Sequence, residues 1–184
     1  MIKRTFDFTF SLILIISLSW LIVLLFIISC IKFKSFGIFF QERIGQYGKI
    51  FTIYKIKSMN INQEINFFGL IIRKYKLDEL PQLFNIIKGE MSFVGPRPDI
   101  VGYYDNLQGE EKNILQLKPG LTSRASIKYR NEEKLLKEKD NPIEYNDKVI
   151  FPDKIKMNLE YYYNHNFFVD LHIIICTIKY ILKP

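Results

Sequence analysis

The sequence predicts an α+β protein in which a membrane-inserted helix precedes a small, mostly helical domain with a short β-hairpin. Residues 8–31 contain no charged side chain, and about 20 apolar helical residues suffice to cross a hydrocarbon core. Two short apolar runs flank Gly45 and Gly48, which is typical of a hairpin. We therefore divide the chain into a membrane-inserted helix, residues 1–34, and a second domain, residues 35–184.

The charges beside the apolar segment bear on its topology. Because the positive-inside rule places basic flanks in the cytoplasm, basic residues at both ends favour a helix that enters and leaves on one side. Such a helix needs a break, and Ser17 and Ser19 can capture freed carbonyls, although no proline is present. These residues alone leave a re-entrant and a spanning helix open. The flanking basic residues are Lys3, Arg4, Lys32 and Lys34.

The remaining elements are predicted from periodicity and turn residues. Leu80, Leu83, Phe84 and Ile87 recur at helical spacing, and Gly89 is a suitable C-cap. The final segment is amphipathic with aromatic residues before it, which is typical of a helix at the headgroup region. Packing on the domain core is the alternative. The expected elements are strands at 37–43 and 50–55, helices at 67–75 and 167–182, and a solvated helix and loop at 131–153.

Composition narrows the class of partner. The 184 residues carry a net charge of +7 with 24% charged side chains, which suits an acidic lipid surface, a phosphorylated substrate or nucleic acid. The basic residues are scattered among acidic ones, so the sequence argues against nucleic acid. Cys30 and Cys176 lie in apolar stretches and indicate neither a disulfide nor a zinc site, consistent with a reducing cytosolic environment.

Asp78 and Glu79 form the strongest candidate site. Asp78 lies where a helix is predicted to begin, with Pro81 in its first turn, a position that tolerates proline. A helix N-terminus favours anions, so we expect Asp78 to stay ionised, as a nucleophile or metal ligand must. By itself an Asp-Glu pair is usually only a solvated helix start.

Nearby cations strengthen this candidate. Arg73, Lys74 and Lys76 precede the pair and would offset repulsion between a phosphate and a carboxylate. Arg97 lies between two prolines that restrict the backbone, and a fixed guanidinium suits bidentate phosphate recognition. A stiff surface turn is the structural alternative for this segment. The combination indicates phosphate chemistry at a membrane surface.

Several motifs in the right order also resemble a known family, the bacterial sugar transferases. These are small monotopic phosphoglycosyl transferases that start glycan assembly on polyprenyl phosphate. The resemblance covers nearly the whole chain. Its motifs are Lys3-Arg4-x-Phe6-Asp7, residues 39–45, Phe51-x-Ile53-Tyr54-Lys55-x-Lys57-Ser58-Met59, residues 77–85, residues 88–99, Lys118-Pro119-Gly120-Leu121-Thr122 and Phe168-x-Asp170.

The resemblance implies a reaction and an arrangement of roles. A nucleotide sugar, usually a UDP-sugar, would give its sugar-1-phosphate to polyprenyl (undecaprenyl) phosphate and release UMP. Asp78 would be the covalent nucleophile and a ligand of Mg²⁺, and Glu79 would either position groups or deprotonate the lipid phosphate. Arg73 and Arg97 would suit the phosphates. The full set of substrate-binding candidates is Arg43, Lys57, Arg73, Arg97 and Arg130.

The resemblance also implies a location. It favours a re-entrant helix at the cytoplasmic face of a bacterial inner membrane and is compatible with a homodimer. Many members have a proline after a serine in the membrane segment, whereas this chain has Ser19-Trp20. Residues 125–130, the polar insertion after Arg130, and Asn158 in place of an aspartate also depart from the pattern. Since these departures lie where a sugar is expected to be recognised, the identity of the sugar is not implied.

A second function class remains open at this point. A non-catalytic, basic membrane-surface module could recruit an acidic partner or lipid. The Asp-Glu pair and the Pro-Arg-Pro turn serve no purpose in anchoring alone, so the sequence favours the enzyme.

Overall fold

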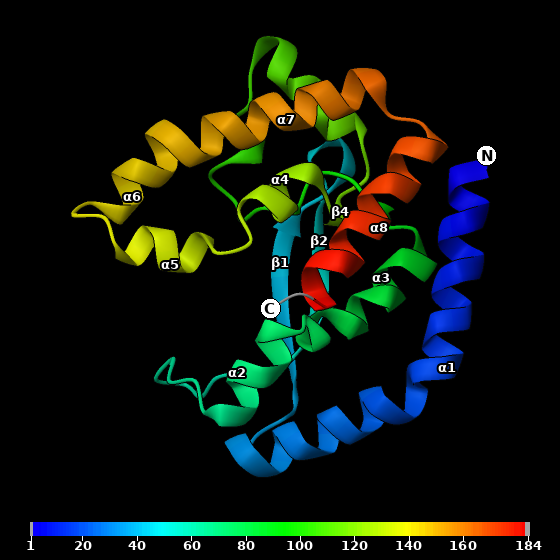
Figure 1. Cartoon of the computed structure of the whole chain (residues 1–184), viewed down its shortest axis with the longest axis vertical. Helices are drawn as coiled ribbons and strands as arrows, with labels where there is room; N and C mark the ends of the chain where they lie inside the picture. The colour runs from blue at the N-terminus through cyan, green and yellow to red at the C-terminus, as the bar shows by residue number, and fades with distance from the viewer. Residues whose placement is uncertain (1, 183–184) are drawn as a thin grey trace.

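The computed structural model describes residues 2–182 and shows a mostly helical α+β protein (Figure 1). The predicted fold class is therefore confirmed in its main features. The longer elements are α1 (Ile2–Phe33), β1 (Ile38–Ile44), β2 (Ile50–Ile56), α2 (Phe67–Lys74), η2 (Leu77–Gln82), α3 (Leu83–Lys88), β3 (Ser92–Val94), η4 (Gly109–Gln116), β4 (Gly120–Thr122), α4 (Arg124–Lys128), α5 (Glu132–Lys137), α6 (Pro142–Tyr145), α7 (Phe151–Asn164) and α8 (Phe167–Leu182). Short turns of helix are η1 (Gln46–Gly48), η3 (Tyr104–Asn106) and η5 (Asn146–Ile150).

Helix α1 is bent although it contains no proline. Figure 1 shows its two halves running in different directions around the domain. Within it, the Ser17 hydroxyl donates to the Ile13 carbonyl at 2.9 Å, and the Ser19 hydroxyl donates to the Ile16 carbonyl at 3.0 Å. Serine hydroxyls that bond back to the preceding turn often bend helices. The serines thus supply a local reason for the bend.

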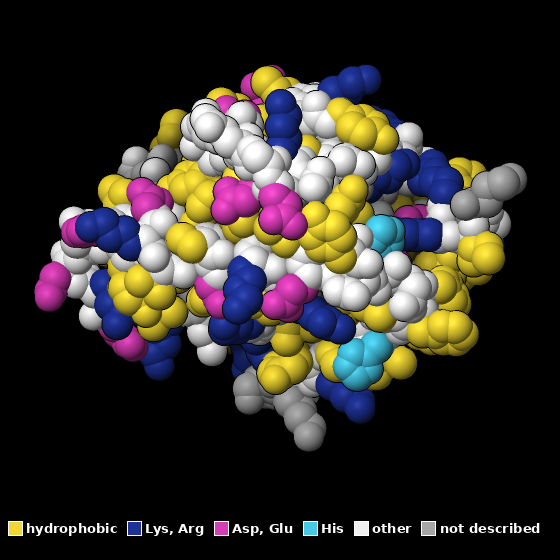
Figure 2. All heavy atoms as spheres, turned by 90° about the horizontal axis from the view of Figure 1, so that it is seen from above, with side chains coloured by type: hydrophobic (Ala, Val, Ile, Leu, Met, Phe, Trp, Pro, Cys, Tyr) yellow, Lys and Arg dark blue, Asp and Glu magenta, His cyan; other side chains and the backbone are white. Residues whose placement is uncertain are grey.

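By length and composition, α1 is the one helix among residues 2–182 that could cross a membrane. Its most apolar 18-residue window has a mean hydropathy of 3.0, and only 11% of that window is buried within the protein. The outward side chains include Ile13, Ile16, Trp20 and Val23. The face over α7, by contrast, carries acidic and basic side chains side by side (Figure 2).

Both ends of α1 are attached to the same domain. Near the start, the Arg4 guanidinium donates to the carbonyls of Ile86 and Ile87, at 2.6 and 2.7 Å, where α3 ends. Near the end, the Ser29 hydroxyl donates to the Lys57 carbonyl at 2.8 Å. The two ends of the apolar helix therefore contact one folded unit.

The predicted hairpin is confirmed. Strands β1 and β2 pair antiparallel, from Ile38 opposite Ile56 to Ile44 opposite Ile50. A second, parallel pair was not predicted. Strands β3 and β4 have three residues each, and a Cβ added to Gly120 would lie 2.1 Å from the backbone nitrogen of Gly95, so this crossing requires glycine.

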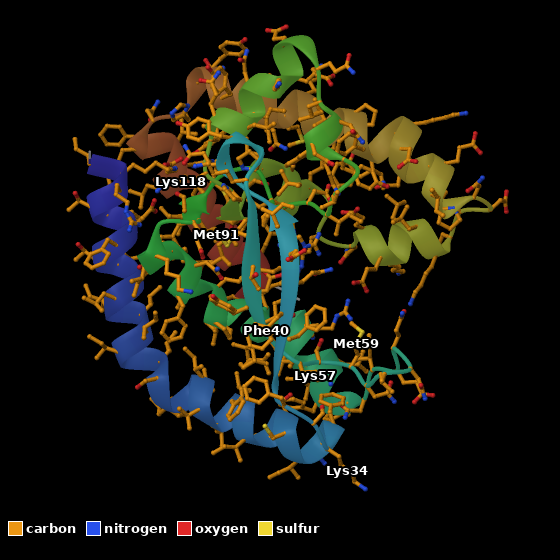
Figure 3. All side chains as sticks on the ribbon, turned by 180° about the vertical axis from the view of Figure 1, so that it is seen from behind. Lys34, Phe40, Lys57, Met59, Met91 and Lys118 are labelled. Carbon is orange, nitrogen blue, oxygen red and sulfur yellow. The ribbon has the colours of Figure 1, made fainter. Side chains whose placement is uncertain are left out.

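The main core lies where β2, α3 and β3 meet α1, α7 and α8. Phe6 and Phe10 of α1 stack with ring centroids 5.3 Å apart and both contact Phe93. Met91, which Figure 3 shows in the interior, is fully buried there. Packing at this core fixes the positions of η2 and α3. Its buried members are Ile53, Leu83, Ile86, Met91, Phe93, Val94, Tyr161 and Ile173.

Two features of the C-terminal part differ from expectation. The segment 131–153, expected to be a solvated helix and loop, is mostly helical: it contains α5, α6, η5 and the start of α7. Pro152 occupies the first turn of α7, where it needs no amide donor. Asp170, expected to interrupt an amphipathic helix, is buried and accepts from Lys3 and from the Tyr161 hydroxyl, both at 2.5 Å.

Candidate active site

A short 3₁₀ helix, η2, carries the candidate carboxylates. Lys76 adopts a left-handed conformation with φ of 56°, which ends the preceding helical segment and turns the chain into η2. Pro81 lies inside this helix, and α3 follows and ends at Gly89, whose φ is 86°. The predicted helix start and glycine cap are both confirmed. Because α3 packs on the core, Asp78 is presented from a fixed position.

Asp78 is a buried carboxylate with a free oxygen. The residue is 8% exposed, and among residues 2–182 its Oδ1 has no hydrogen-bond partner. Burial, and next the charge of Glu79, raise the pKa of Asp78 to about 6, against the opposing charges of Lys55, Lys76 and Arg73. The carboxylate is therefore still mostly ionised at pH 7, as expected for a nucleophile.

Glu79 has the opposite environment. Its carboxylate forms a two-pronged contact with the Arg97 guanidinium, at 2.5 and 3.4 Å, and lies 3.5 Å from the Lys55 ammonium. Burial alone would push the pKa of Glu79 up, but the charges of Arg97, Lys55 and Lys76 together hold it well below its usual value. Glu79 is thus a fixed counter-ion and a poor base.

Lys55 lies beside the two carboxylates, although it was not among the predicted candidates. Its side chain is 19% exposed, and burial is the main reason why its pKa is lowered, with Glu79 acting against it. Lys57, the residue expected instead, lies past the end of β2, where its ammonium donates to Ser35 at 2.8 Å (Figure 3). Because side chains alternate along a strand, Lys55 lies on the same face as the buried Ile53. This alternation is the sequence signal that could have identified Lys55.

The predicted arginines do not all come together. Arg97 contacts Glu79. Burial lowers the pKa of Arg43, and the charges of Arg97 and Glu79 also act on it. Arg43 also donates to Gln41 at 2.7 Å, and its buried Nε has no partner within the described range 2–182. Arg73, at the end of α2, is one of the charges acting on Asp78.

Two of the arginines make contacts with distant elements. Arg73 forms an ion pair with Glu133 of α5. Arg130, the last of the predicted substrate-binding residues, donates to the Tyr180 carbonyl of α8. The structure thus places Arg130 at α8, whereas Arg97 contacts Glu79, the charge of Arg73 acts on Asp78, and the charge of Glu79 acts on Arg43.

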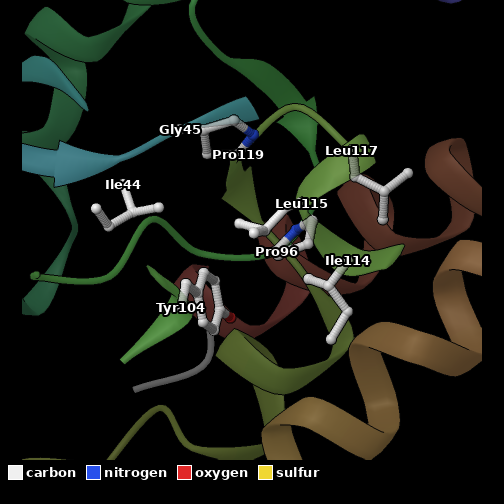
Figure 4. A pocket seen from close by; sticks show the side chains of 8 residues that line it. All are labelled: Ile44, Gly45, Pro96, Tyr104, Ile114, Leu115, Leu117 and Pro119. Carbon is white, nitrogen blue, oxygen red and sulfur yellow. The ribbon is translucent and has the colours of Figure 1, made fainter. Parts of the chain in front are cut away.

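The turn that carries Arg97 is supported from behind. A small cavity next to it is lined by apolar side chains (Figure 4), and Pro96 accepts from the Gly120 amide at 2.8 Å. This apolar lining gives the cavity a packing role. The Gly-Pro-Arg-Pro segment is therefore both a stiff turn and a support for a charged group. The lining residues are Ile44, Gly45, Pro96, Tyr104, Ile114, Leu115, Leu117 and Pro119.

The donor set suits Mg²⁺ shared with a substrate. Among the residues described, no group of three His, Cys, Asp or Glu side chains could hold a metal ion. Asp78 offers a carboxylate whose Oδ1 is unpartnered within the described part of the chain, whereas Glu79 is engaged by cations. Mg²⁺ is commonly bound by one or two carboxylates together with substrate phosphates and water. The site fits that mode and not an all-protein cage.

Comparison with known proteins identifies the family. The bacterial sugar transferase family model matches residues 1–184. The chain is 31% identical to the uncharacterized sugar transferase EpsL of Bacillus subtilis, over 98% of this chain and 87% of that protein. It is 29% identical to the undecaprenyl-phosphate galactose phosphotransferase of Salmonella typhimurium, over 99% of this chain and 40% of that protein.

A further relative carries both substrates in its name. The UDP-N-acetylgalactosamine-undecaprenyl-phosphate N-acetylgalactosaminephosphotransferase of Aeromonas hydrophila is 31% identical over 83% of this chain and 37% of that protein. The chain thus spans less than half the length of this relative and of the Salmonella protein, but most of EpsL. The match over the whole chain confirms the predicted enzyme class over the non-catalytic alternative, and the protein belongs to the bacterial sugar transferase family.

Proposed function

We propose that the protein transfers a sugar-1-phosphate from a UDP-sugar to undecaprenyl phosphate and releases UMP. The observation that carries this proposal is the buried Asp78 carboxylate, which has an unpartnered oxygen and lies among Lys55, Lys76 and Arg73. The names of the relatives support undecaprenyl phosphate as the acceptor and a UDP-sugar as the donor.

In the first step, Asp78 attacks the phosphorus that bears the sugar. A bond forms between its carboxylate oxygen and that phosphorus, and the bond from phosphorus to the UMP oxygen breaks, so UMP leaves with its electron pair. The phosphosugar is then held on Asp78 as an acyl phosphate. Arg97 and Arg43 would bind the diphosphate oxygens, since guanidinium groups match phosphate geometry.

In the second step, an oxygen of the lipid phosphate attacks the same phosphorus. The bond to Asp78 breaks, the carboxylate is regenerated, and the product is a lipid-linked diphosphate sugar. Of the two roles open to Glu79, its low pKa supports positioning, because a carboxylate held by Arg97 and Lys55 is a weak base. Glu79 then keeps both cations aimed at the phosphates.

Mg²⁺ would be held by the Asp78 carboxylate together with the donor diphosphate. When bound, it would neutralise negative charge on the phosphates and on departing UMP. The residues of the chain supply the remaining compensation: Lys55 and Arg97 are already positioned by Glu79 before any substrate arrives. Such preorganised charges need no rearrangement during the reaction.

A re-entrant α1 at the cytoplasmic face is part of the proposal. Arg4 and Ser29, near opposite ends of the helix, both bond to the same folded domain, and basic residues flank both ends of the apolar segment. A straight span would carry these ends to opposite sides of the bilayer. In the re-entrant arrangement the site lies beside the membrane that holds the acceptor lipid.

The test is a single-turnover reaction without acceptor lipid. Purified protein in detergent, a panel of UDP-sugars and Mg²⁺ should yield about one UMP per protein and a mass increase equal to a sugar phosphate on Asp78. Asp78→Asn should give neither, while the exposed control Asp140→Asn should give both. A folded wild-type protein that yields neither UMP nor labelled lipid, even with acceptor added, would overturn the proposal.

A further inference from the structure

The polar insertion after Arg130 is attached to the body of the protein through two adjacent carboxylates. Glu132 accepts from the Lys154 ammonium of α7 at 2.7–2.8 Å. Glu133 forms its ion pair with Arg73 at the end of α2, sixty positions away in sequence. The first turn of α5 therefore bridges α7 and α2.

Through Glu133 and Arg73, the first turn of α5 is connected to the proposed donor site. Arg73 is one of the cations that act on Asp78, and the charge of Glu132 acts on Arg97. Without substrate, Glu133 supplies Arg73 with the negative charge that a donor phosphate would otherwise bring. A carboxylate and a phosphate oxygen use the same guanidinium donors, so the two compete.

The ion pair between Glu133 and Arg73 is weak enough for another anion to replace Glu133. The Glu133 side chain is 71% exposed, whereas Arg73 is 25% exposed, and ion pairs with an exposed partner contribute little to stability. Neither α5 nor α6 has a buried residue, so core packing does not fix these helices. Elements with few buried contacts open most readily, and Figure 1 shows α5 and α6 at the edge of the molecule.

We propose that Glu133 is a displaceable latch: it occupies Arg73 in the free enzyme, and the donor diphosphate replaces it while α5 stays attached through Glu132 and Lys154. The latch rests on the proposed function, because the competing anion is the UDP-sugar donor. It assigns to the insertion a role in controlling access to the site. The exposed position of Glu133 makes release by a more highly charged anion favourable.

The test is UDP binding to the full chain in detergent with Mg²⁺, measured by calorimetry. Glu133→Gln removes the competing charge and should tighten UDP binding about threefold at low salt. The difference should vanish at about 1 M salt, where exposed charges are screened. The matched control is Glu144→Gln in α6, since Glu144 forms an exposed ion pair with Lys148, and its affinity should equal that of wild type.

The outcomes separate the latch from the proposed function. Wild-type protein that binds UDP with an affinity unchanged or weakened by Glu133→Gln would overturn the latch and leave the donor assignment standing; a weakened affinity would mean that Glu133 holds Arg73 in a productive position. Failure of both proteins to bind UDP would overturn the donor assignment and the latch with it. Tighter binding by Glu133→Gln alone supports the latch.

Discussion

The η2 site and the α5–α6 insertion both contain adjacent acidic residues paired with cations, but they are stabilised differently. In η2, Asp78 and Glu79 are less than a tenth exposed, and Lys55 reaches them from β2. In α5 no residue is buried, and the Glu133 side chain is largely in water. The first region depends on core packing for its geometry, and the second depends on surface ion pairs.

The charges of η2 are therefore fixed in position, whereas a ligand can replace an ion-pair partner in α5. Charges in a buried cluster interact strongly and are oriented in advance, which suits a group that must react at a defined point. Charges in water are screened and weakly coupled, which suits a contact that a ligand must replace. Matching substitutions in the two regions should therefore give effects of very different size.

The largest expected loss of stability follows from Glu79→Gln. This change leaves Lys55 and Arg97 without their main counter-ion, and breaking a buried pair is strongly destabilising. Because Arg97 keeps 42% of its side chain exposed, we expect a loss of about 2–3 kcal/mol, measured by denaturant unfolding in detergent. The exposed Glu110→Gln should change stability by less than about 0.5 kcal/mol. Equal losses for the two variants would remove the distinction between the regions.

The part of this site that could be predicted is the part with local signals. The position of Pro81 and the apolar spacing after it identify the helix start at Asp78, and Gly89 identifies the end of α3. To distinguish Lys55 from Lys57, the end of β2 would have to be known to within two residues. Sequence boundaries are not that precise.

Long-range contacts were beyond prediction for a different reason. Asp170 reads as a polar interruption in α8, yet it pairs with Lys3, 167 positions away. The three-residue strands β3 and β4 are too short to show periodicity. Nor does the charge pattern of the insertion indicate that Glu133 selects Arg73 as its partner. Such pairs depend on tertiary packing and leave no local pattern.

Asp78→Asn changes the same region as Glu79→Gln, but we expect it to increase folding stability. Burial raises the pKa of Asp78 from 3.8 to about 6, so the folded state binds a proton more tightly than the unfolded chain, and stability falls as pH rises between these values. At pH 7 the neutral variant should be more stable than wild type by about 3 kcal/mol. The advantage should shrink as pH falls from 6 and disappear near pH 2–3, below the unfolded-state pKa of 3.8, where both states of wild type are protonated. A loss of stability at pH 7 would contradict the assigned burial cost.

The pH dependence of adduct formation isolates the same group kinetically. Without acceptor lipid, Asp78 is the titrating group in the proposed first step, since the donor diphosphate keeps its charge through this range. The single-turnover rate should rise with pH and level off above an apparent pKa of about 6, so pH 5 should give roughly a tenth of the plateau rate. A midpoint near 4 would show that the carboxylate is solvated in the working enzyme.

The smallest effect is expected from Glu132→Gln in the insertion. Glu132 and Lys154 are 30% and 22% exposed, so their pair lies between the buried η2 cluster and a fully solvated contact. We expect a loss of at most about 1 kcal/mol in unfolding free energy and an adduct-formation rate within about twofold of wild type, because Glu132 contacts no proposed reacting group. A loss as large as that of Glu79→Gln would mean that the insertion is as firmly integrated as η2. In that case Glu133 could not leave Arg73 independently, so this control also bears on the latch.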